Sequence, residues 1–235
     1  MFREKLIENG KIYYSDLLPQ LEHFFTTRDT NVDENRTVIC NYLRIEPENL
    51  INPTQTHSSN VDFAKVGVTD YPDTDALILD NSEQALYLRF ADCTPVILYN
   101  KKTNIAAIAH AGWRGTAEKI VVKTVQKMID NNSDTDDIYA VIGPAIGICC
   151  YEVGNEVIEK MKNTISDYEG VITDDNHIDL KGINARQLKE AGVLEKNIDI
   201  CPFCTSCRND IFYSYRKENG TPYRHNAVIK LGVNL

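Results

Sequence analysis

Three residues have the types and the surroundings expected of a catalytic metal centre. His57 lies in a polar run after Pro53, Cys93 lies in the break between two apolar runs, and His110 ends a third apolar run. We expect all three at the ends of strands, where catalytic groups are often displayed. Two imidazoles and one thiolate would suit a zinc ion with three protein ligands and one open position. Because 36 and 17 positions separate these residues, they form no local metal signature, and buried structural roles for each remain the alternative.

The number of histidines limits the metal chemistry. A centre with several copper ions needs many imidazoles, usually in His-x-His pairs. This chain has five histidines and no such pair. The sequence therefore argues against multicopper oxidase chemistry within one chain.

The remaining cysteines form a second pattern. Cys201, Cys204 and Cys207 are spaced as two overlapping C-x-x-C pairs, which could be part of a zinc or iron–sulfur site. These three cysteines lack a fourth ligand, and the sequence has no separate C-x-x-C pair elsewhere that could supply it. We therefore expect a structural or incidental thiol cluster. The adjacent Cys149 and Cys150 are not expected to face one site together.

The run Ala109-His-Ala-Gly-Trp-Arg-Gly115 marks a junction between a strand and a helix. Its glycines are expected to allow a sharp turn. Trp113 is predicted to be a core anchor. Arg114 begins the helix, where free N–H groups and the helix dipole could help it hold an anion such as phosphate; a surface ion pair is the alternative.

Composition indicates one soluble domain over residues 1–235. The net charge of −9 argues against nucleic acid or an anionic membrane surface as the main partner. No apolar run is long enough to cross a bilayer. The first residues are charged and have no apolar signal core, which predicts a cytoplasmic protein. The sequence gives no prediction of oligomeric state.

Apolar runs that alternate with turn residues predict an α+β fold with mixed, largely antiparallel sheets. Thr27–Arg36 is predicted to be a loop. Helical spacing after Gly115 predicts a helix that ends at Asn131–Ser133, and two further helices are expected at Val153–Met161 and Leu180–Ala191. The predicted strands are Ala76–Leu79, Ala85–Phe90, Pro95–Tyr99, Asn104–Ala109, Ile138–Ile142, Ile211–Tyr215 and Ala227–Leu231.

Several motifs together resemble the laccase-domain family, also called the YfiH or peptidoglycan-editing-factor family and now described as purine nucleoside phosphorylases. The most specific are the runs around Cys93 (Ala-Asp-Cys-Thr-Pro) and His110. The other supporting runs, in family order, are Phe25–Arg28, Gln55–Ser58, Asp75–Ile78, Ile142–Pro144, Tyr151–Gly154, Ile178–Leu180 and Tyr213–Arg216.

The resemblance implies a layered α/β/β/α fold and a zinc site formed by His57, Cys93 and His110. A mixed Cys/His site could also take up copper in vitro. The implied activity is phosphorolysis of adenosine, inosine and S-methyl-5'-thioadenosine, with adenosine deaminase activity also attributed to the family. The implied partners are therefore a purine nucleoside and phosphate.

Roles for polar residues in the implied reaction are our own hypotheses, and the phosphate candidates are chosen by charge and bidentate geometry. Arg28 and Arg114 are our candidates for phosphate, and Gln55 and Arg216 for other substrate contacts. Asp92 could orient a ligand or relay a proton. The alternative enzyme is a metal-free amidase with Cys93 as nucleophile and a histidine as base, acting on a peptidoglycan precursor.

The chain departs from the family pattern at two places. Asp29–Glu34 replaces a glycine-rich turn, and Thr221–Arg224 replaces the usual Thr-Gly-Arg. Both segments are expected to border the pocket, so substrate preference is left open.

Overall fold

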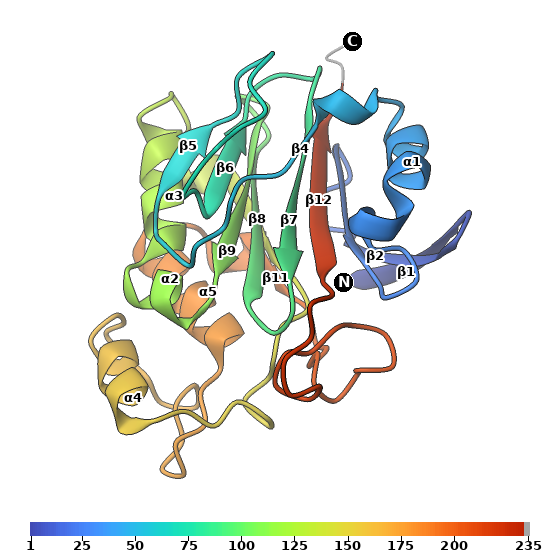
Figure 1. Ribbon diagram of the computed structural model, residues 1–235. Helices are drawn as coiled ribbons and strands as arrows, with labels where there is room; N and C mark the ends of the chain where they lie inside the picture. The colour runs from blue at the N-terminus through green and yellow to red at the C-terminus, as the bar shows by residue number, and fades with distance from the viewer. Residues whose placement is uncertain (233–235) are drawn as a thin grey trace.

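Two six-stranded sheets stack face to face in the computed structural model, which describes residues 1–232 (Figure 1). The first sheet contains, in spatial order, β1 (Phe2–Ile7), β2 (Gly10–Ser15), β3 (Leu21–Thr26), β12 (His225–Leu231), β7 (Ala85–Phe90) and β4 (Leu50–Ile51). The second contains β11 (Ile198–Ile200), β10 (Ile138–Ile142), β8 (Thr94–Asn100), β9 (Ile105–Ala111), β6 (Ala76–Leu79) and β5 (Val61–Phe63). Three pairs are parallel, namely β4–β7, β5–β6 and β10–β11.

The sequence of the central strand β9 does not alternate between apolar and polar residues. All seven of its residues are buried, because both of its faces are covered. Ala106 and Ile108 point into the core between the two sheets, whereas Ala107 and Ala109 face the helices. Successive side chains on a strand point to opposite faces, so a strand buried on both sides is apolar throughout.

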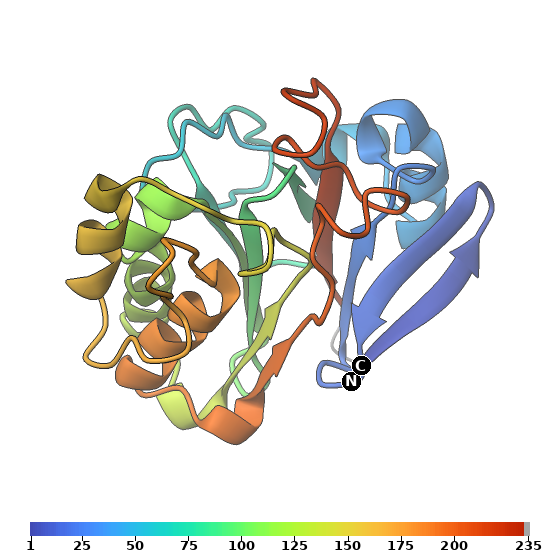
Figure 2. The same ribbon diagram turned by 90° about the horizontal axis from the view of Figure 1, so that it is seen from below.

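Helices cover the outer face of each sheet, as seen from below in Figure 2. Helix α1 (Val32–Leu43) packs on the first sheet through a separate apolar cluster. On the other side, α3 (Ile120–Ile129) and α5 (Leu180–Glu190) cover the second sheet. The short α2 (Trp113–Ala117) and α4 (Asn155–Lys162) pack on each other beside them. The predicted layered α+β fold is confirmed.

The predicted strand at Ile211–Tyr215 is wrong. This segment belongs to a loop, in which the carbonyl of Ile211 accepts the backbone N–H of Arg28. Phe212 is fully buried within that loop, so its apolar residues serve packing and not a strand ladder.

The predicted loop at Thr27–Arg36 is wrong over its second half, where α1 begins. Asn31 caps this helix, since its side chain accepts the N–H of Glu34 and also donates to the Glu34 carboxylate. The first contact is a standard N-cap, whereas the Glu34 carboxylate binds the Asn31 side-chain amide and not its backbone N–H, as it would in a capping box. The polar residues hid the helix because most of its first turns face solvent.

The helix predicted after Gly115 is two helices. Lys119, with φ of 57°, lies in the left-handed region between α2 and α3 and breaks the hydrogen-bond ladder there. Within residues 1–232, every helix is too short or too polar to span a bilayer.

Candidate active site

Strand register brings Cys93 and His110 together at one end of the two sheets. Cys93 lies in the turn between β7 and β8, and Pro95 of β8 pairs with His110 of β9. Asp92 makes this turn with φ of 84°, in the left-handed region that non-glycine residues adopt infrequently. Two residues 17 positions apart thus become neighbours through one hairpin.

His57 arrives from the loop between β4 and β5, also with a left-handed φ, here 64°. Its backbone N–H donates to the carboxylate of Asp75 at 3.1 Å. Asp75 directly precedes β6, whose Ala76 pairs with Ala109 of β9. Asp75 therefore stands beside His110 and ties the His57 loop to the strand that carries the second imidazole.

The Asp75 carboxylate is completely buried and fully engaged. It accepts from His110 Nδ1 at 2.7 Å, from the backbone N–H groups of Thr56 and Ser58, and from the Ser58 hydroxyl. Burial by itself would raise the pKa of Asp75, but the His110 hydrogen bond and charge outweigh it and lower the pKa to about 2. Asp75 is therefore an anion that fixes the ring orientation of His110.

The three predicted ligands converge. One donor atom from each of His57, Cys93 and His110 lies within 4.8 Å of the others, and Cys93 Sγ is 3.8 Å from His57 Nε2. Because Asp75 binds Nδ1 of His110, its Nε2 is the nitrogen free to face the cluster. A carboxylate behind a ligating histidine is the usual support of a metal site. The donor set thus fits zinc with one open position.

Without a metal, the shifted pKa values of half-buried Cys93 and buried His110 favour a thiolate beside an imidazolium. Burial raises the pKa of Cys93, but the charge and hydrogen bond of His110 and the contact with His57 dominate and lower it to about 6. Burial likewise lowers the pKa of His110, whereas the Cys93 charge and the Asp75 hydrogen bond raise it to about 9. Thiolate is also the form of cysteine that binds metals.

Gly112 lies against the cluster because no side chain fits there. A Cβ at this position would stand 2.9 Å from Cys93 Sγ and 3.2 Å from His57 Cδ2. Its φ of −68° is ordinary. The expected role of the Gly112 and Gly115 pair in a sharp turn is therefore replaced by close packing: a Cβ on Gly115 would lie 3.2 Å from the carbonyl oxygens of His110 and Ser58.

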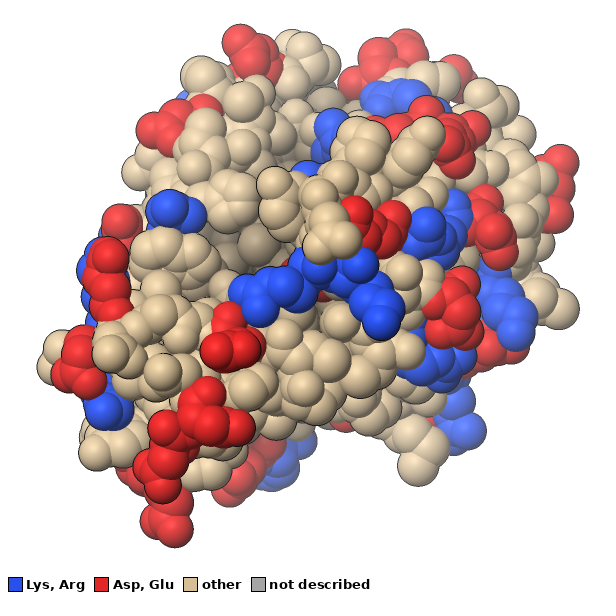
Figure 3. All heavy atoms as spheres, turned by 60° about the horizontal axis from the view of Figure 1, so that its bottom comes forward, with Lys and Arg blue, Asp and Glu red and all other residues tan. Residues whose placement is uncertain are grey.

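The cluster lies in a pocket of about 780 Å³. Figure 3, which brings this end of the molecule forward, shows basic side chains beside a hollow. Beside the three candidate metal ligands, three arginines and two tyrosines line the pocket: Arg89, Arg216, Arg224, Tyr151 and Tyr215. A pocket with cationic groups and aromatic rings can bind a molecule that has a planar ring and an anion.

Three of the five polar residues that we predicted to act on the substrate line this pocket, namely Gln55, Asp92 and Arg216. Gln55 and Arg216 line it, although the Gln55 amide is paired with the backbone of Arg89. Asp92 also lines it, but its carboxylate accepts from the Thr205 hydroxyl and the backbone N–H of Arg216. Asp92 therefore supports the pocket wall, and the ligand-orienting contact predicted for it belongs to Asp75.

The two arginines predicted to bind phosphate lie outside the described lining. Arg28 forms an ion pair with Glu218 at 2.9 Å and stacks on the ring of Tyr213. Arg114 is exposed and lies over the ring of Trp113, which is itself half-buried against α4. Arg114 was expected to face the pocket from the helix start, but α2 directs it toward a separate hollow beside Lys160.

Sequence reasoning missed Asp75, Arg89, Arg224 and Tyr151. Asp75 and Tyr151 stand in runs that carried the family resemblance, so a signal was present without a role. Arg224 lies in the Thr221–Arg224 departure, which borders the pocket as expected. Arg89 is the next-to-last residue of the apolar strand β7, where an isolated charge is the available signal.

Two of the five histidines reach this centre. His23 is buried elsewhere and accepts the N–H of Ser15, and His225 is enclosed by aromatic rings. His177 lies near Asp175. The imidazoles required by a multicopper centre are therefore not gathered in the part of the chain that the structure describes.

Comparison with known proteins finds relatives that are similar to most of this chain. The purine nucleoside phosphorylase YlmD of Geobacillus stearothermophilus is 32% identical over 219 residues, which cover 85% of this chain and 78% of that protein. The adenosine deaminase RL5 of an unknown prokaryotic organism is 31% identical over 77% of this chain and 75% of its own length.

Solved structures match over nearly the whole chain. The crystal structure of the hypothetical protein YfiH of Bacillus licheniformis superposes with a TM-score of 0.90 at 29% identity, covering 97% of this chain and 99% of that one. The model of one protein family, described as multi-copper polyphenol oxidoreductase laccase, matches residues 21–232. The chain belongs to this family, whose descriptive name is at odds with the two-histidine, one-cysteine centre found here.

Proposed function

We propose that this chain is a zinc-dependent purine nucleoside phosphorylase that acts on adenosine, inosine and S-methyl-5'-thioadenosine, and that it also deaminates adenosine. One observation carries the proposal: an open centre of His57, Cys93 and His110 lies in a pocket that also holds three arginines and two tyrosines. The names of the relatives, a phosphorylase and a deaminase, support the same chemistry.

His57, Cys93 and His110 would hold the zinc ion, and zinc supplies Lewis-acid activation at its open coordination position. Asp75 keeps a proton on Nδ1 of His110 and so presents Nε2 to the metal. Tyr151 and Tyr215 offer aromatic faces for the purine ring. Burial raises the pKa of Tyr151, so its hydroxyl stays protonated and can donate to the substrate.

In phosphorolysis, a phosphate oxygen forms a bond to the anomeric carbon while the bond from that carbon to the base nitrogen breaks. The electron pair leaves with the base, which takes up a proton. The pocket arginines Arg89, Arg216 and Arg224 can hold the phosphate, since guanidinium groups bind phosphate oxygens in pairs. In deamination, water adds to the ring carbon that carries the amine, and ammonia leaves.

The test is a product analysis by mass spectrometry. Zinc-loaded protein is incubated with adenosine, with and without inorganic phosphate. Adenine and ribose 1-phosphate are expected only when phosphate is present, and inosine in both cases; a chelator should abolish both reactions and added zinc restore them. Absence of all three products above background would rule out the proposal.

Two arginine variants test the phosphate site. We expect Arg216→Ala to raise the KM for phosphate about tenfold or more, because one charge-assisted contact is lost. Arg114→Ala is the matched control and should leave this KM unchanged, since Arg114 lies outside the lining. A raised KM for phosphate in Arg114→Ala but not in Arg216→Ala would instead assign phosphate binding to Arg114, as the sequence analysis predicted.

A metal-free cysteine hydrolase, an amidase acting on a peptidoglycan precursor, is the second candidate. The observation in its favour is the contact of Cys93 Sγ with His57 Nε2 at 3.8 Å, together with the lowered pKa of the thiol. This enzyme would work in the presence of a chelator and would be inactivated by alkylation of Cys93. Loss of activity with the chelator and recovery with zinc would exclude it.

A further inference from the structure

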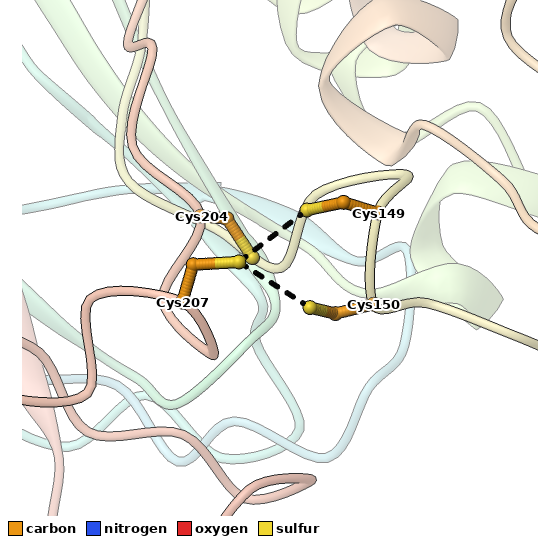
Figure 4. A group of neighbouring side chains, drawn as sticks. All are labelled: Cys149, Cys150, Cys204 and Cys207. Atoms are coloured by element: carbon orange, nitrogen blue, oxygen red, sulfur yellow. Dashed lines mark hydrogen bonds between the residues drawn. The ribbon is translucent and has the colours of Figure 1, made fainter.

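Four cysteines outside the active site meet at one point, contrary to the expectation from sequence. Cys149 and Cys150 come from the loop after β10, whereas Cys204 and Cys207 come from the loop after β11. Figure 4 shows the four side chains directed toward one another. The adjacent pair does face one site together, and it supplies the ligands that the C-x-x-C pattern lacked.

Backbone groups of both loops hold them in this position. Ala145 and Cys204 form a parallel bridge, and the N–H of Thr205 donates to the carbonyl of Ala145. The N–H of Gly147 donates to Cys204 Sγ at 3.1 Å. A Cβ on Gly147 would lie 3.1 Å from Cys204 Cβ and 3.3 Å from Cys149 Sγ, so a glycine leaves the space that the sulfurs use.

The sulfur separations match a shared metal ion and not a disulfide. Cys207 Sγ lies 3.6 Å from Cys149 Sγ and 3.5 Å from Cys150 Sγ, and one sulfur from each of the four residues falls within 4.8 Å of the others. Tetrahedral zinc with bonds of about 2.3 Å to sulfur places its ligands about 3.8 Å apart. A disulfide requires about 2.05 Å.

We propose that Cys149, Cys150, Cys204 and Cys207 bind a second zinc ion, in a tetrahedral site made only of thiolates. Four protein ligands leave no open position, so this site is structural. Cys149 and Cys207 are exposed and Cys204 is buried, which gives zinc a route from solvent. The inference concerns metal binding alone and does not depend on the proposed function.

The site would brace the wall of the pocket. Tyr151, next to Cys150, lines the pocket. Thr205, next to Cys204, donates its hydroxyl to Asp92, which neighbours the active-site Cys93. Zinc that joins the two loops would therefore fix groups on both sides of the first centre.

The test counts zinc in a protein whose first centre is removed. The double variant His57→Ala with His110→Ala is purified under reducing conditions with zinc present, and zinc is measured by mass spectrometry. We expect about two zinc ions per chain in the unsubstituted protein and about one in the double variant. Adding Cys207→Ser to the double variant should remove the remaining ion, whereas Cys201→Ser, a cysteine of the same loop outside the cluster, should not.

X-ray absorption spectroscopy on the double variant identifies the atoms bound to zinc. This measurement does not require the cysteine variants to fold. Four sulfur neighbours at about 2.3 Å from zinc are expected. A double variant without metal, iron in place of zinc, a disulfide among these cysteines found by mass spectrometry after alkylation, or nitrogen and oxygen neighbours would overturn the proposal.

Discussion

Asp75 is the residue on which the geometry of the active site depends most. Its carboxylate binds the ring of His110 and three consecutive backbone N–H groups, from Thr56 to Ser58, so it sets both the strand imidazole and the loop imidazole. The left-handed conformation of His57 is held by these bonds. One buried anion thus preorganises two of the three ligands.

Asp75→Asn should weaken zinc binding by about 10–100-fold, the usual effect of losing a carboxylate behind a ligating histidine. Asparagine keeps the shape but removes the charge that orients Nδ1–H of His110. The measurement is competition with a chelator of known affinity. Asp80→Asn serves as the control, because Asp80 is exposed and follows the other end of β6. Equal zinc affinities for the two variants would contradict the role given to Asp75.

Gly112→Ala should disturb the same centre by steric contact. The new methyl group would approach Cys93 Sγ to 2.9 Å, closer than van der Waals contact allows. We expect lower zinc occupancy and lower activity, read by metal analysis and turnover. Gly154→Ala is the matched control, because a Cβ there meets no atom within 4 Å. Full zinc occupancy with unchanged turnover in Gly112→Ala would show that the site can relax around the added methyl group.

At the scale of elements, the loop between β11 and β12 is held by an ion pair between Glu218 and Arg28, a residue that sequence reasoning assigned to phosphate binding. Glu218 accepts from Arg28 at 2.9 Å, from the Asn209 amide at 2.7 Å and from the N–H of Ser214 at 3.1 Å. Burial opposes ionisation, but these contacts lower the pKa of Glu218 to about 2. The same loop carries Tyr215 and Arg216 into the pocket.

Glu218→Gln should lower the free energy of unfolding by about 1–3 kcal/mol at neutral pH. The folded pKa lies below the ordinary value, so the stabilisation is complete above about pH 5 and is lost as the pH falls toward 2. Urea unfolding at pH 7 and near pH 3 should show the gap between the variant and the original protein shrinking in acid. Glu83→Gln, an exposed carboxylate, should show no gap at either pH. A gap for Glu218→Gln that is constant with pH would refute the ion-pair explanation.

The elements that sequence predicted well are those whose pattern is local. The strands at Ala76–Leu79 and Ile138–Ile142 were predicted with their observed bounds, because short apolar runs between turn residues suffice to define them. Ile211–Tyr215 has the same local pattern but packs within a loop, since its backbone partner is Arg28 on a distant strand end. Local pattern does not contain that information.

At the scale of the whole molecule, the residue types of the candidate ligands could be read from the sequence, whereas most of their convergence depends on tertiary structure. Cys93 and His110 meet through a hairpin, which local reasoning can anticipate. His57 and Asp75 join them through a parallel strand pair and a long loop, which it cannot. Sequence reasoning did not predict the four-cysteine cluster for the same reason. Its two halves lie on loops that follow two neighbouring parallel strands.

Gly143 packs against the ring of Phe25 between the two sheets at the active-site end, and we expect this contact to help set their separation there. Gly143 follows β10 of the second sheet, and Phe25 lies in β3 of the first and is fully buried. A Cβ on Gly143 would fall 2.6 Å from Cζ of the Phe25 ring. A side chain here therefore has to push the two sheets apart or displace the ring.

Gly143→Ala should reduce the free energy of unfolding by about 1–3 kcal/mol, as overpacking of a filled core does. Phe25→Leu should also destabilise the protein, because it leaves a cavity. In the double variant the smaller leucine makes room for the methyl group. The loss of unfolding free energy in the double variant should therefore be smaller than the sum of the two single losses. Denaturant unfolding of the four proteins measures this coupling. Strict additivity would mean that Gly143 and Phe25 do not set the sheet separation, and that the pocket at this end is positioned by its loops alone.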